Sequence, residues 1–189
     1  MDKKELCKRY NEGENFDFLF FWHSRSYLSN WYPIEFTIDN ITYWCVEQYM
    51  MAEKARLFQD NEILKKIMLS DNQKEIKSFG RKIKNFNQAL WDLNKENIVF
   101  TGNLAKFTQN EILRNYIIST KDRILVEASP YDKIWGIGLS IENDNGKIKN
   151  PTNWKGLNLL GFTLMKVRDT IINNEKIKNN FLKELKENI

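Results

Sequence analysis

A predicted β-hairpin that runs directly into a helix limits the possible folds of this chain more than any other feature. Residues 34–38 and 41–44 alternate around Asp39-Asn40, a two-residue turn signal, and this pattern predicts an antiparallel hairpin. The second strand leads without a linker into residues 43–58, where side chains recur at helical spacing. We therefore expect the rest of the chain to be organised around this helix.

The predicted central helix presents two stripes of side chains. One stripe contains Val46, Tyr49, Met50, Glu53 and Leu57, and the other contains Glu47, Met51, Lys54 and Phe58. Glu47 lies in the first turn, where the partial positive charge of a helix start favours a carboxylate, and Lys54 follows two turns later. A rigid element that presents both groups beside aromatic neighbours is typical of sites where protonation is tuned. An amphipathic core helix with solvated or paired charges is the alternative.

The remaining elements are mostly helices. Strands are expected at 16–22 and 124–128, and helices at 61–69, 72–79, 88–92, 95–107, 109–118 and 158–172. Asp60 and Ser70-Asp71 are the expected N-caps of the first two of these helices, and Gly80 is expected to end the second. We expect residues 1–15 to form a short helix or loose arm, 142–155 a mobile surface loop, and 173–189 a charged solvated helix or tail.

Length and composition indicate one domain with an aromatic-lined cleft. The 189 residues suffice for a single core, and six Trp with twelve Phe exceed the needs of a simple helical bundle. There is no run of about 18 apolar residues and no signal-peptide pattern, so we expect a soluble cytoplasmic protein. The net charge of +4 is compatible with a phosphate-bearing ligand or a nucleic acid but does not require either.

The residue inventory argues against metal and serine-hydrolase chemistry. A zinc site would need more than one His and the distant pair Cys7 and Cys45, and a Ser-His-Asp triad would depend on His23 alone. Gly136-x-Gly138 is not a dinucleotide-binding fingerprint, because it lacks the third glycine and does not open a helix. We therefore expect neither a metal nor a cofactor.

Carboxylates and tryptophans are the remaining candidates for chemistry. Glu47 and Asp132 both stand near Trp or Tyr at the boundaries of predicted elements, a setting that suits acid–base work on a flat ring held by stacking. Trp91 precedes an aspartate, and Trp135 follows Asp132 by three positions. A core role is the alternative for each tryptophan, because large aromatic side chains are mostly buried for their area.

Ordered blocks of residues give the chain a family resemblance. The blocks are Leu28-Ser29-Asn30, Val46-Glu47-Gln48-Tyr49, Lys54-Ala55, Gly80-Arg81, Trp91-Asp92, Lys106-Phe107, Leu125-Val126-Glu127-Ala128-Ser129, Asp132, Trp135-Gly136-x-Gly138 and Leu160-Gly161. In this order the sequence resembles the NADAR family, also called YbiA-like, over residues 16–172. The resemblance implies a compact, mostly helical α+β domain with a small antiparallel sheet. It also implies an N-glycosidase that cleaves the bond between ribose and a base-like nitrogen. The implied substrates are riboflavin-pathway ribosylamino-pyrimidine intermediates or ADP-ribosyl-guanine in nucleic acid.

The resemblance assigns roles to Glu47, Asp132, Trp91 and Trp135. Breaking an N-glycosidic bond builds positive charge on the sugar, so a carboxylate must face that charge or activate a water, and the leaving base must accept a proton. We expect Glu47 and Asp132 to divide these roles. Trp91 and Trp135 are expected to stack on the base or frame the sugar.

Lysines and arginines supply alternatives within the same site. Lys54 or Lys106 would attack the ring-opened ribose as a Schiff base if burial deprotonates the amine. Arg25, Arg81 and Lys106 are candidates to hold a phosphate, with plain surface charge as the alternative for Arg25, and the substrate-binding set includes Asn30.

A nucleic-acid substrate would have to be single-stranded or flipped out, which predicts a basic groove beside the pocket. Lys176, Lys178, Lys183 and Lys186 would extend such a groove or lie on a plain solvated helix. Two other functional classes compete with the hydrolase: a non-catalytic ADP-ribose or NAD binding module, and a nucleic-acid-binding accessory protein. The oligomeric state is open.

Overall fold

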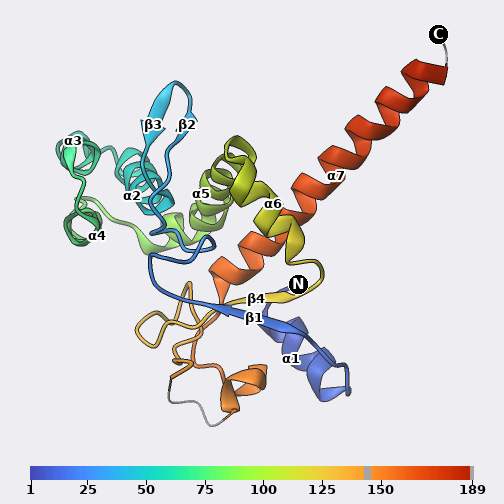
Figure 1. The fold of residues 1–189 in the computed structure, drawn as a ribbon. Helices are drawn as coiled ribbons and strands as arrows, with labels where there is room; N and C mark the ends of the chain where they lie inside the picture. Colours follow the sequence, from blue (N-terminus) through green and yellow to red (C-terminus); the bar gives the residue numbers. More distant parts are fainter. Residues whose placement is uncertain (143–145, 188–189) are drawn as a thin grey trace.

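The computed structural model describes residues 1–142 and 146–187, with side-chain surroundings as far as residue 178, and helices dominate it (Figure 1). The α-helices are α1 Lys3–Asn11, α2 Val46–Leu57, α3 Asn61–Leu69, α4 Gln73–Arg81, α5 Gln88–Gln109, α6 Glu111–Ser119 and α7 Leu159–Glu187. The strands are β1 Phe18–Phe21, β2 Phe36–Ile38, β3 Ile41–Tyr43 and β4 Ile124–Glu127. The expected mostly helical α+β class is confirmed.

The β2–β3 hairpin forms as the sequence predicts. The two strands pair antiparallel, with Ile38 opposite Ile41. Asp39 and Asn40 both have positive φ angles, 51° and 62°, which is the turn conformation whose twist matches that of a hairpin. After β3 only two residues precede α2, and Cys45 caps that helix by accepting a hydrogen bond from the Gln48 backbone N–H at its thiol.

Helix α2 lies at the centre of the core, with α3, α4 and α5 packed around it. Its buried residues are Val46, Glu47, Gln48, Tyr49, Met50, Met51, Ala52 and Ala55. The approach of α5 is close enough to require a glycine, because a Cβ at Gly102 would lie 2.6 Å from the Tyr49 ring. A helix buried on this many sides carries its polar side chains into the interior, and Glu47 is one of them.

The start of α3 is confirmed, whereas the predicted limits of α4 are wrong at both ends. Asp60 caps α3 through its Oδ1, and α4 is capped by Asn72 instead of Ser70-Asp71. Gly80 does not end α4, which continues to Arg81. Gly80 serves packing instead, because a Cβ there would lie 2.0 Å from the sulfur of Met51 on α2.

Strands β1 and β4 pair in parallel although they lie far apart in the sequence (Figure 1). The register places Phe18 opposite Ile124 and Phe21 opposite Glu127. Glu127 is therefore at the carboxyl end of this pair. From there the chain enters the segment 128–138, which is called here the carboxylate loop.

A second, smaller core lies around the N-terminal helix and the segment before α7. It consists of Leu6, Ile124, Val126, Ala128, Ile137, Ile148, Trp154 and Phe162. The expectation of a mobile surface loop at 142–155 is wrong for its described part, because Ile148 and Trp154 are buried and two short 3-10 turns, Lys147–Lys149 and Pro151–Asn153, organise it. Residues 143–145 of that expectation lie outside the described residues.

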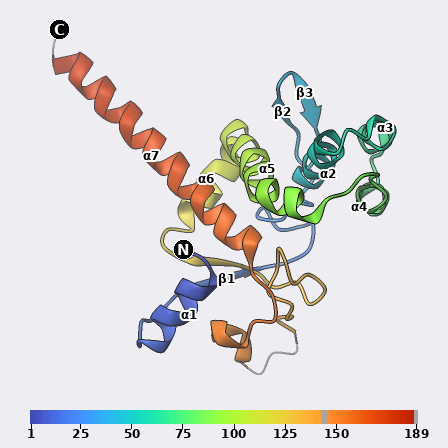
Figure 2. The same ribbon diagram turned by 180° about the vertical axis from the view of Figure 1, so that it is seen from behind.

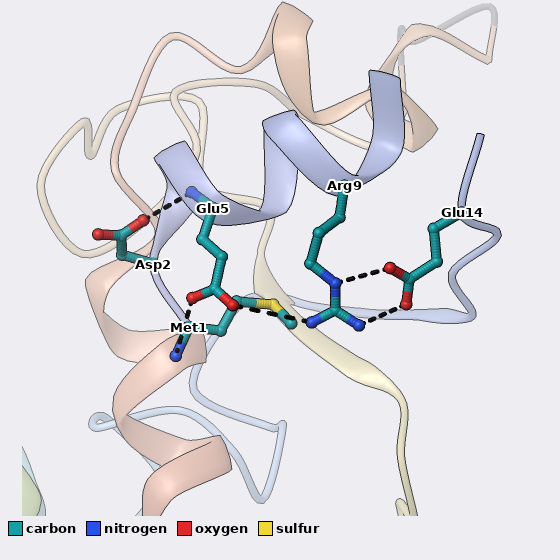
Figure 3. Close-up of polar contacts among 5 residues, drawn as sticks. All are labelled: Met1, Asp2, Glu5, Arg9 and Glu14. Carbon is teal, nitrogen blue, oxygen red and sulfur yellow. Dashed lines mark hydrogen bonds and ion pairs between the residues drawn. The ribbon is translucent and has the colours of Figure 1, made fainter. Parts of the chain in front are cut away.

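Helix α1 is attached to this second core. Asp2 caps it by accepting a hydrogen bond from the Glu5 N–H, and Arg9 pairs with Glu5 and Glu14 (Figure 3). Such exposed pairs contribute little stability. The attachment comes from Leu6, which is fully buried.

Helix α7 continues past residue 172, so the segment from residue 173 to 187 is helical, which is one of its two expected forms. Its first half buries Leu160, Leu164, Val167 and Ile171 against α5 and β4, and its second half extends away from the rest of the molecule (Figure 2). Lys176 and Lys178 are exposed, whereas the side chains of Lys183 and Lys186 lie outside the described residues. No helix in the described part of the chain has the length and apolar character needed to cross a membrane.

Candidate functional site

A cavity of ≈ 200 Å³ lies where α2, α4, α5, the end of β4 and the carboxylate loop meet. Its lining consists of Asn30, Trp31, Glu47, Met50, Met51, Lys54, Lys77, Gly80, Arg81, Trp91, Glu127, Asp132, Ile134, Trp135 and Leu160. The residues that the sequence singles out and that lie in this lining are Asn30, Glu47, Lys54, Arg81, Trp91, Asp132 and Trp135. The fold thus brings together groups that are separated by up to about half the chain.

Glu47 faces the cavity from the first turn of α2. Its backbone N–H donates to the Asn30 carbonyl at 2.9 Å, and only 5% of the residue is exposed. Within the described part of the chain its carboxyl group has no hydrogen bond or ion pair. Burial therefore raises the pKa of Glu47 to about 7; the charges of Lys77 and Lys54 oppose this shift, and the charge of Asp132 adds to it.

Asp132 faces the same space from the carboxylate loop. Its Oδ1 accepts hydrogen bonds from the backbone N–H groups of Ile134 and Trp135, both at 2.8 Å. These bonds fix the orientation of the Asp132 carboxylate. They also fix the backbone position of Trp135. The loop can pass over the end of β4 because residue 136 is glycine, whose added Cβ would lie 2.9 Å from the Glu127 carbonyl oxygen.

The start of α7 holds the carboxylate loop in place. Backbone N–H groups of residues 157–160 donate to the carbonyls of residues 133–136, at 3.0 to 3.2 Å. Asn158 adds a second attachment, because its side chain donates to the Leu125 carbonyl and accepts from the Glu127 N–H, both at 2.9 Å. Loop, strand end and helix start therefore form one hydrogen-bonded unit.

Lys54 reaches the rim of the cavity between aromatic rings. Its Nζ donates to the Gly80 carbonyl at 2.9 Å and lies 5.4 Å from the Trp91 ring centroid and 4.4 Å from that of Phe86. Partial burial lowers the pKa of Lys54, and the charge of Glu47 opposes this. The amine is therefore held by a carbonyl oxygen and two rings.

Three tryptophans frame the cavity. Trp91 is 9% exposed and stands in the first turn of α5, while Trp135 and Trp31 are half-buried. Trp31 was not singled out from the sequence. Its carbonyl accepts from the Gln73 side chain at 2.7 Å, and its ring lies 5.7 Å from Lys77 Nζ. Flat, partly open rings at the rim can stack on a planar ligand.

Lys106 and Arg25 lie outside this lining. Lys106 is 0% exposed, and its Nζ donates to the carbonyls of Tyr27 and Ser29 at 2.6 and 2.9 Å. Burial lowers the pKa of Lys106 to about 7. The structure therefore gives Lys106 no access to a ligand in the cavity and corrects its place in both the Schiff-base and the phosphate-binding sets. Arg25 is exposed, which agrees with plain surface charge.

Asn30 borders the cavity, but its oxygen atoms accept hydrogen bonds from other residues of the chain. Its Oδ1 accepts from the Asn103 side chain at 2.9 Å, and its backbone carbonyl accepts from the Glu47 N–H. Lys106 holds the segment just before it. Asn30 thus contributes to the position of Glu47 as well as to the lining.

Sequence reasoning missed Glu127 and Lys77. Glu127 stands at the end of β4, and its Oε2 is out of contact with solvent and has no hydrogen-bond partner among the described residues. Burial, with added repulsion from Asp132 and Glu47 and opposed by Lys77, raises the pKa of Glu127 to about 8. A signal existed for Glu127, because it lies in the block 125–129 that carries part of the family resemblance, whereas an exposed helical lysine such as Lys77 gives none.

The acidic and basic groups of the lining differ in exposure. Glu47 is buried and Glu127 and Asp132 are half-buried, whereas Lys77 and Arg81 are exposed on α4 at the rim. Carboxyl groups can stabilise a cation and transfer protons, and the rim can bind an anion. No cluster of His, Cys, Asp and Glu with the form of a metal site is found among the described residues.

Comparison with known proteins shows which family and which solved structure this chain resembles. A family model for the NADAR domain matches residues 20–172. The sequence is 45% identical to N-glycosidase R617 of Acanthamoeba polyphaga mimivirus over 147 residues, which cover 75% of this chain and 85% of that one. It is 33% identical to Protein irg-1 of Caenorhabditis elegans over 188 residues, covering 91% and 88%. The NMR structure of Escherichia coli YbiA matches with a TM-score of 0.69 at 24% identity, over 86% of this chain and 89% of that one, and so shares the fold.

Proposed function

The chain belongs to the NADAR domain family, and from this premise we propose that it is an N-glycosidase that hydrolyses the bond between a phosphorylated ribose and a base nitrogen. The observation that carries the proposal is the shared cavity of Glu47, Asp132 and two tryptophans. A hydrolase of N-glycosyl bonds needs a carboxylate near the sugar, a proton source for the base and a surface on which a ring can stack. The lining supplies each of these groups.

The reaction proceeds by cleavage between the sugar carbon and the base nitrogen. The bonding electrons go to the nitrogen, which takes up a proton, and the oxygen of a water bonds to the sugar carbon and releases one. Asp132, oriented by two backbone N–H groups, faces the positive charge of the sugar. Glu47, with a pKa near neutrality, is suited to accept the proton of the water.

The cationic rim supports a phosphorylated substrate. Lys77 and Arg81 lie one turn apart on α4, and neither forms an ion pair in the part of the chain that the structure describes. A guanidinium and an ammonium that are free in this way bind phosphate oxygens by charge-assisted hydrogen bonds. We assign the phosphate of the substrate to this edge of the cavity.

The size of the cavity supports a substrate that extends beyond it. Ligand pockets usually measure about 300–1,000 Å³, so ≈ 200 Å³ suits a ribose and part of a base. A neighbouring groove of ≈ 370 Å³ continues along α4. It is lined by Trp31, Gln73, Lys74, Lys77, Ser78 and Arg81.

In this groove the Trp31 ring lies among three cationic side chains. They are those of Lys74, Lys77 and Arg81. Such a surface fits the adenosine diphosphate part of an ADP-ribosyl group. It also fits a nucleic-acid strand that is single or flipped out. We therefore favour ADP-ribosyl-guanine in nucleic acid as the substrate. The second candidate is a ribosylamino-pyrimidine phosphate of the riboflavin pathway, which the cavity alone could hold.

The test is product release from both substrates. Purified protein is incubated with an oligonucleotide that carries ADP-ribosyl-guanine and, separately, with the ribosylamino-pyrimidine phosphate, and free ADP-ribose or ribose phosphate is measured by mass spectrometry. We expect ADP-ribose release, and a loss of about 10²-fold or more in the Glu47→Gln variant. Glu53→Gln is the matched control, because Glu53 lies on the same helix and pairs with Arg56. A binding module would release nothing and would keep its affinity for ADP-ribose in Glu47→Gln.

Borohydride trapping separates the carboxylate route from the lysine route. Only a Schiff base leaves a reducible adduct. We expect no adduct during turnover. An adduct that disappears in Lys54→Arg would reassign the nucleophile to Lys54, which lies in the lining.

A further inference from the structure

Glu127 is a rigidly placed carboxyl group that the proposed mechanism has not yet used. Its backbone N–H donates to Asn158 Oδ1 at 2.9 Å, and its carbonyl accepts from the Ile137 N–H at 3.0 Å. It also pairs in register with Phe21 across the parallel sheet. The backbone is therefore fixed on both sides, and the side chain is left to face the cavity that it lines.

The surroundings of Glu127 favour an uncharged carboxyl group. Its Oε2 is buried and unpartnered among the described residues, and a carboxylate buried without a partner is costly. The charges that reach it from α2 and from the carboxylate loop are those of Glu47 and Asp132, and both repel an anion. On α4 the charged lining residues are Lys77 and Arg81, and Lys54 lines the cavity from α2. Of these cations only Lys77 opposes the rise in the pKa of Glu127.

We propose that Glu127 is the general acid of the site and donates its proton to the base nitrogen as the bond to the sugar breaks. This inference rests on the proposed function and deepens it. In the step the O–H bond of the Glu127 carboxylic acid breaks, its proton bonds to the leaving nitrogen, and Glu127 becomes a carboxylate. The proton released by the attacking water restores the acid by way of Glu47 or bulk water.

The proposal gives each carboxyl group one task. Asp132 accepts hydrogen bonds from two backbone N–H groups and is suited to face a positive charge, whereas Glu127 has an oxygen without a hydrogen-bond partner among the described residues. The cavity that Glu127 lines is the side from which a leaving nitrogen approaches its carboxyl group. Buried carboxyl groups kept neutral near pH 7 are suited to proton donation, because the proton is present when the leaving group needs it.

The test compares wild type, Glu127→Gln and Glu127→Asp with the oligonucleotide substrate across pH. In wild type, kcat should fall at alkaline pH as Glu127 loses its proton. We expect Glu127→Gln to lower kcat by about 10²-fold with little change in KM and to abolish this fall. Glu127→Asp should restore part of the rate. Glu111→Gln, an exposed glutamate on α6, is the matched control. A thermal unfolding scan checks that each variant is folded.

A second readout does not depend on turnover. Infrared spectra at neutral pH should show protonated carboxyl absorption that Glu127→Gln weakens, leaving the part contributed by Glu47, and that the control keeps in full. An active wild type whose Glu127→Gln variant keeps kcat within about threefold, or keeps the alkaline fall, overturns this inference and leaves the proposed function in place. A wild type that releases no product from either of the two substrates overturns the proposed function and this role with it.

Discussion

Replacing Glu47 by Gln should favour the variant over wild type increasingly as pH rises from 4.5 to about 7, because in this window the native state holds a proton on Glu47 that the unfolded chain loses. The pKa of Glu47 is raised from 4.5 to about 7 by burial. Between these values the folded protein binds more protons than the unfolded chain, so the free energy of unfolding falls as pH rises through this window. Glutamine cannot ionise and removes this dependence.

The magnitude follows from the two pKa values. At about 1.36 kcal/mol per pH unit, the interval from 4.5 to about 7 corresponds to about 3 kcal/mol. The difference in unfolding free energy between Glu47→Gln and wild type should therefore move by about 3 kcal/mol in favour of the variant between about pH 4 and pH 8. Glu127 is coupled to Glu47, so loss of the Glu47 charge also lowers the cost of ionising Glu127 and adds to the gain.

The assay is urea unfolding at a series of pH values for wild type, Glu47→Gln and Glu53→Gln. Subtraction removes contributions that both proteins share, such as that of Lys106, whose lowered pKa makes stability rise with pH above about 7. Glu53→Gln replaces another glutamate of the same helix and controls for the substitution itself. A Glu47→Gln difference that stays constant from pH 4 to pH 8 would refute the assignment of a buried Glu47 with a raised pKa.

Three further changes test the packing and the rim. Gly161→Ala should lower the unfolding free energy by about 3 kcal/mol, because its Cβ would lie 2.0 Å from the Leu125 carbonyl oxygen; an unchanged urea midpoint would contradict that contact. Lys106→Met should cost about 2 kcal/mol, since two buried carbonyl oxygens lose their donor, and the reasoning fails if thermal unfolding shows a stabilised variant. Lys77→Ala should raise KM about tenfold with kcat nearly unchanged in steady-state kinetics, and a fall in kcat alone would remove Lys77 from phosphate binding.

Local signals predicted the elements that depend on local chemistry. The hairpin follows from Asp39-Asn40, whose residues adopt the left-handed region readily, and the start of α3 follows from a carboxylate cap at Asp60. Gly80 was misread as a helix end, because glycine is common at that position. Its actual role is the close approach of α4 to Met51, which depends on tertiary packing and leaves no local pattern.

The candidate site was predictable where family blocks and chemistry agreed, as for Glu47 and Asp132. Glu127 and Lys77 were missed because their positions depend on long-range contacts: the parallel pairing of β1 with β4 and the packing of α4 on α2. Lys106 shows the opposite error. Lys106 was assigned to the ligand site, but its amine is bound by the carbonyls of a segment 77 to 79 positions away.

The hydrogen bonds at the start of α7 have a consequence for how an anion can be recognised. A helix beginning beside a ligand site commonly receives phosphate on its free N–H groups. Here those of residues 157–160 already serve carbonyls of the carboxylate loop. Anion recognition is therefore left to the long side chains of α4. Single substitutions there can change the preference for one ligand over another, while the backbone that holds Asp132 stays the same.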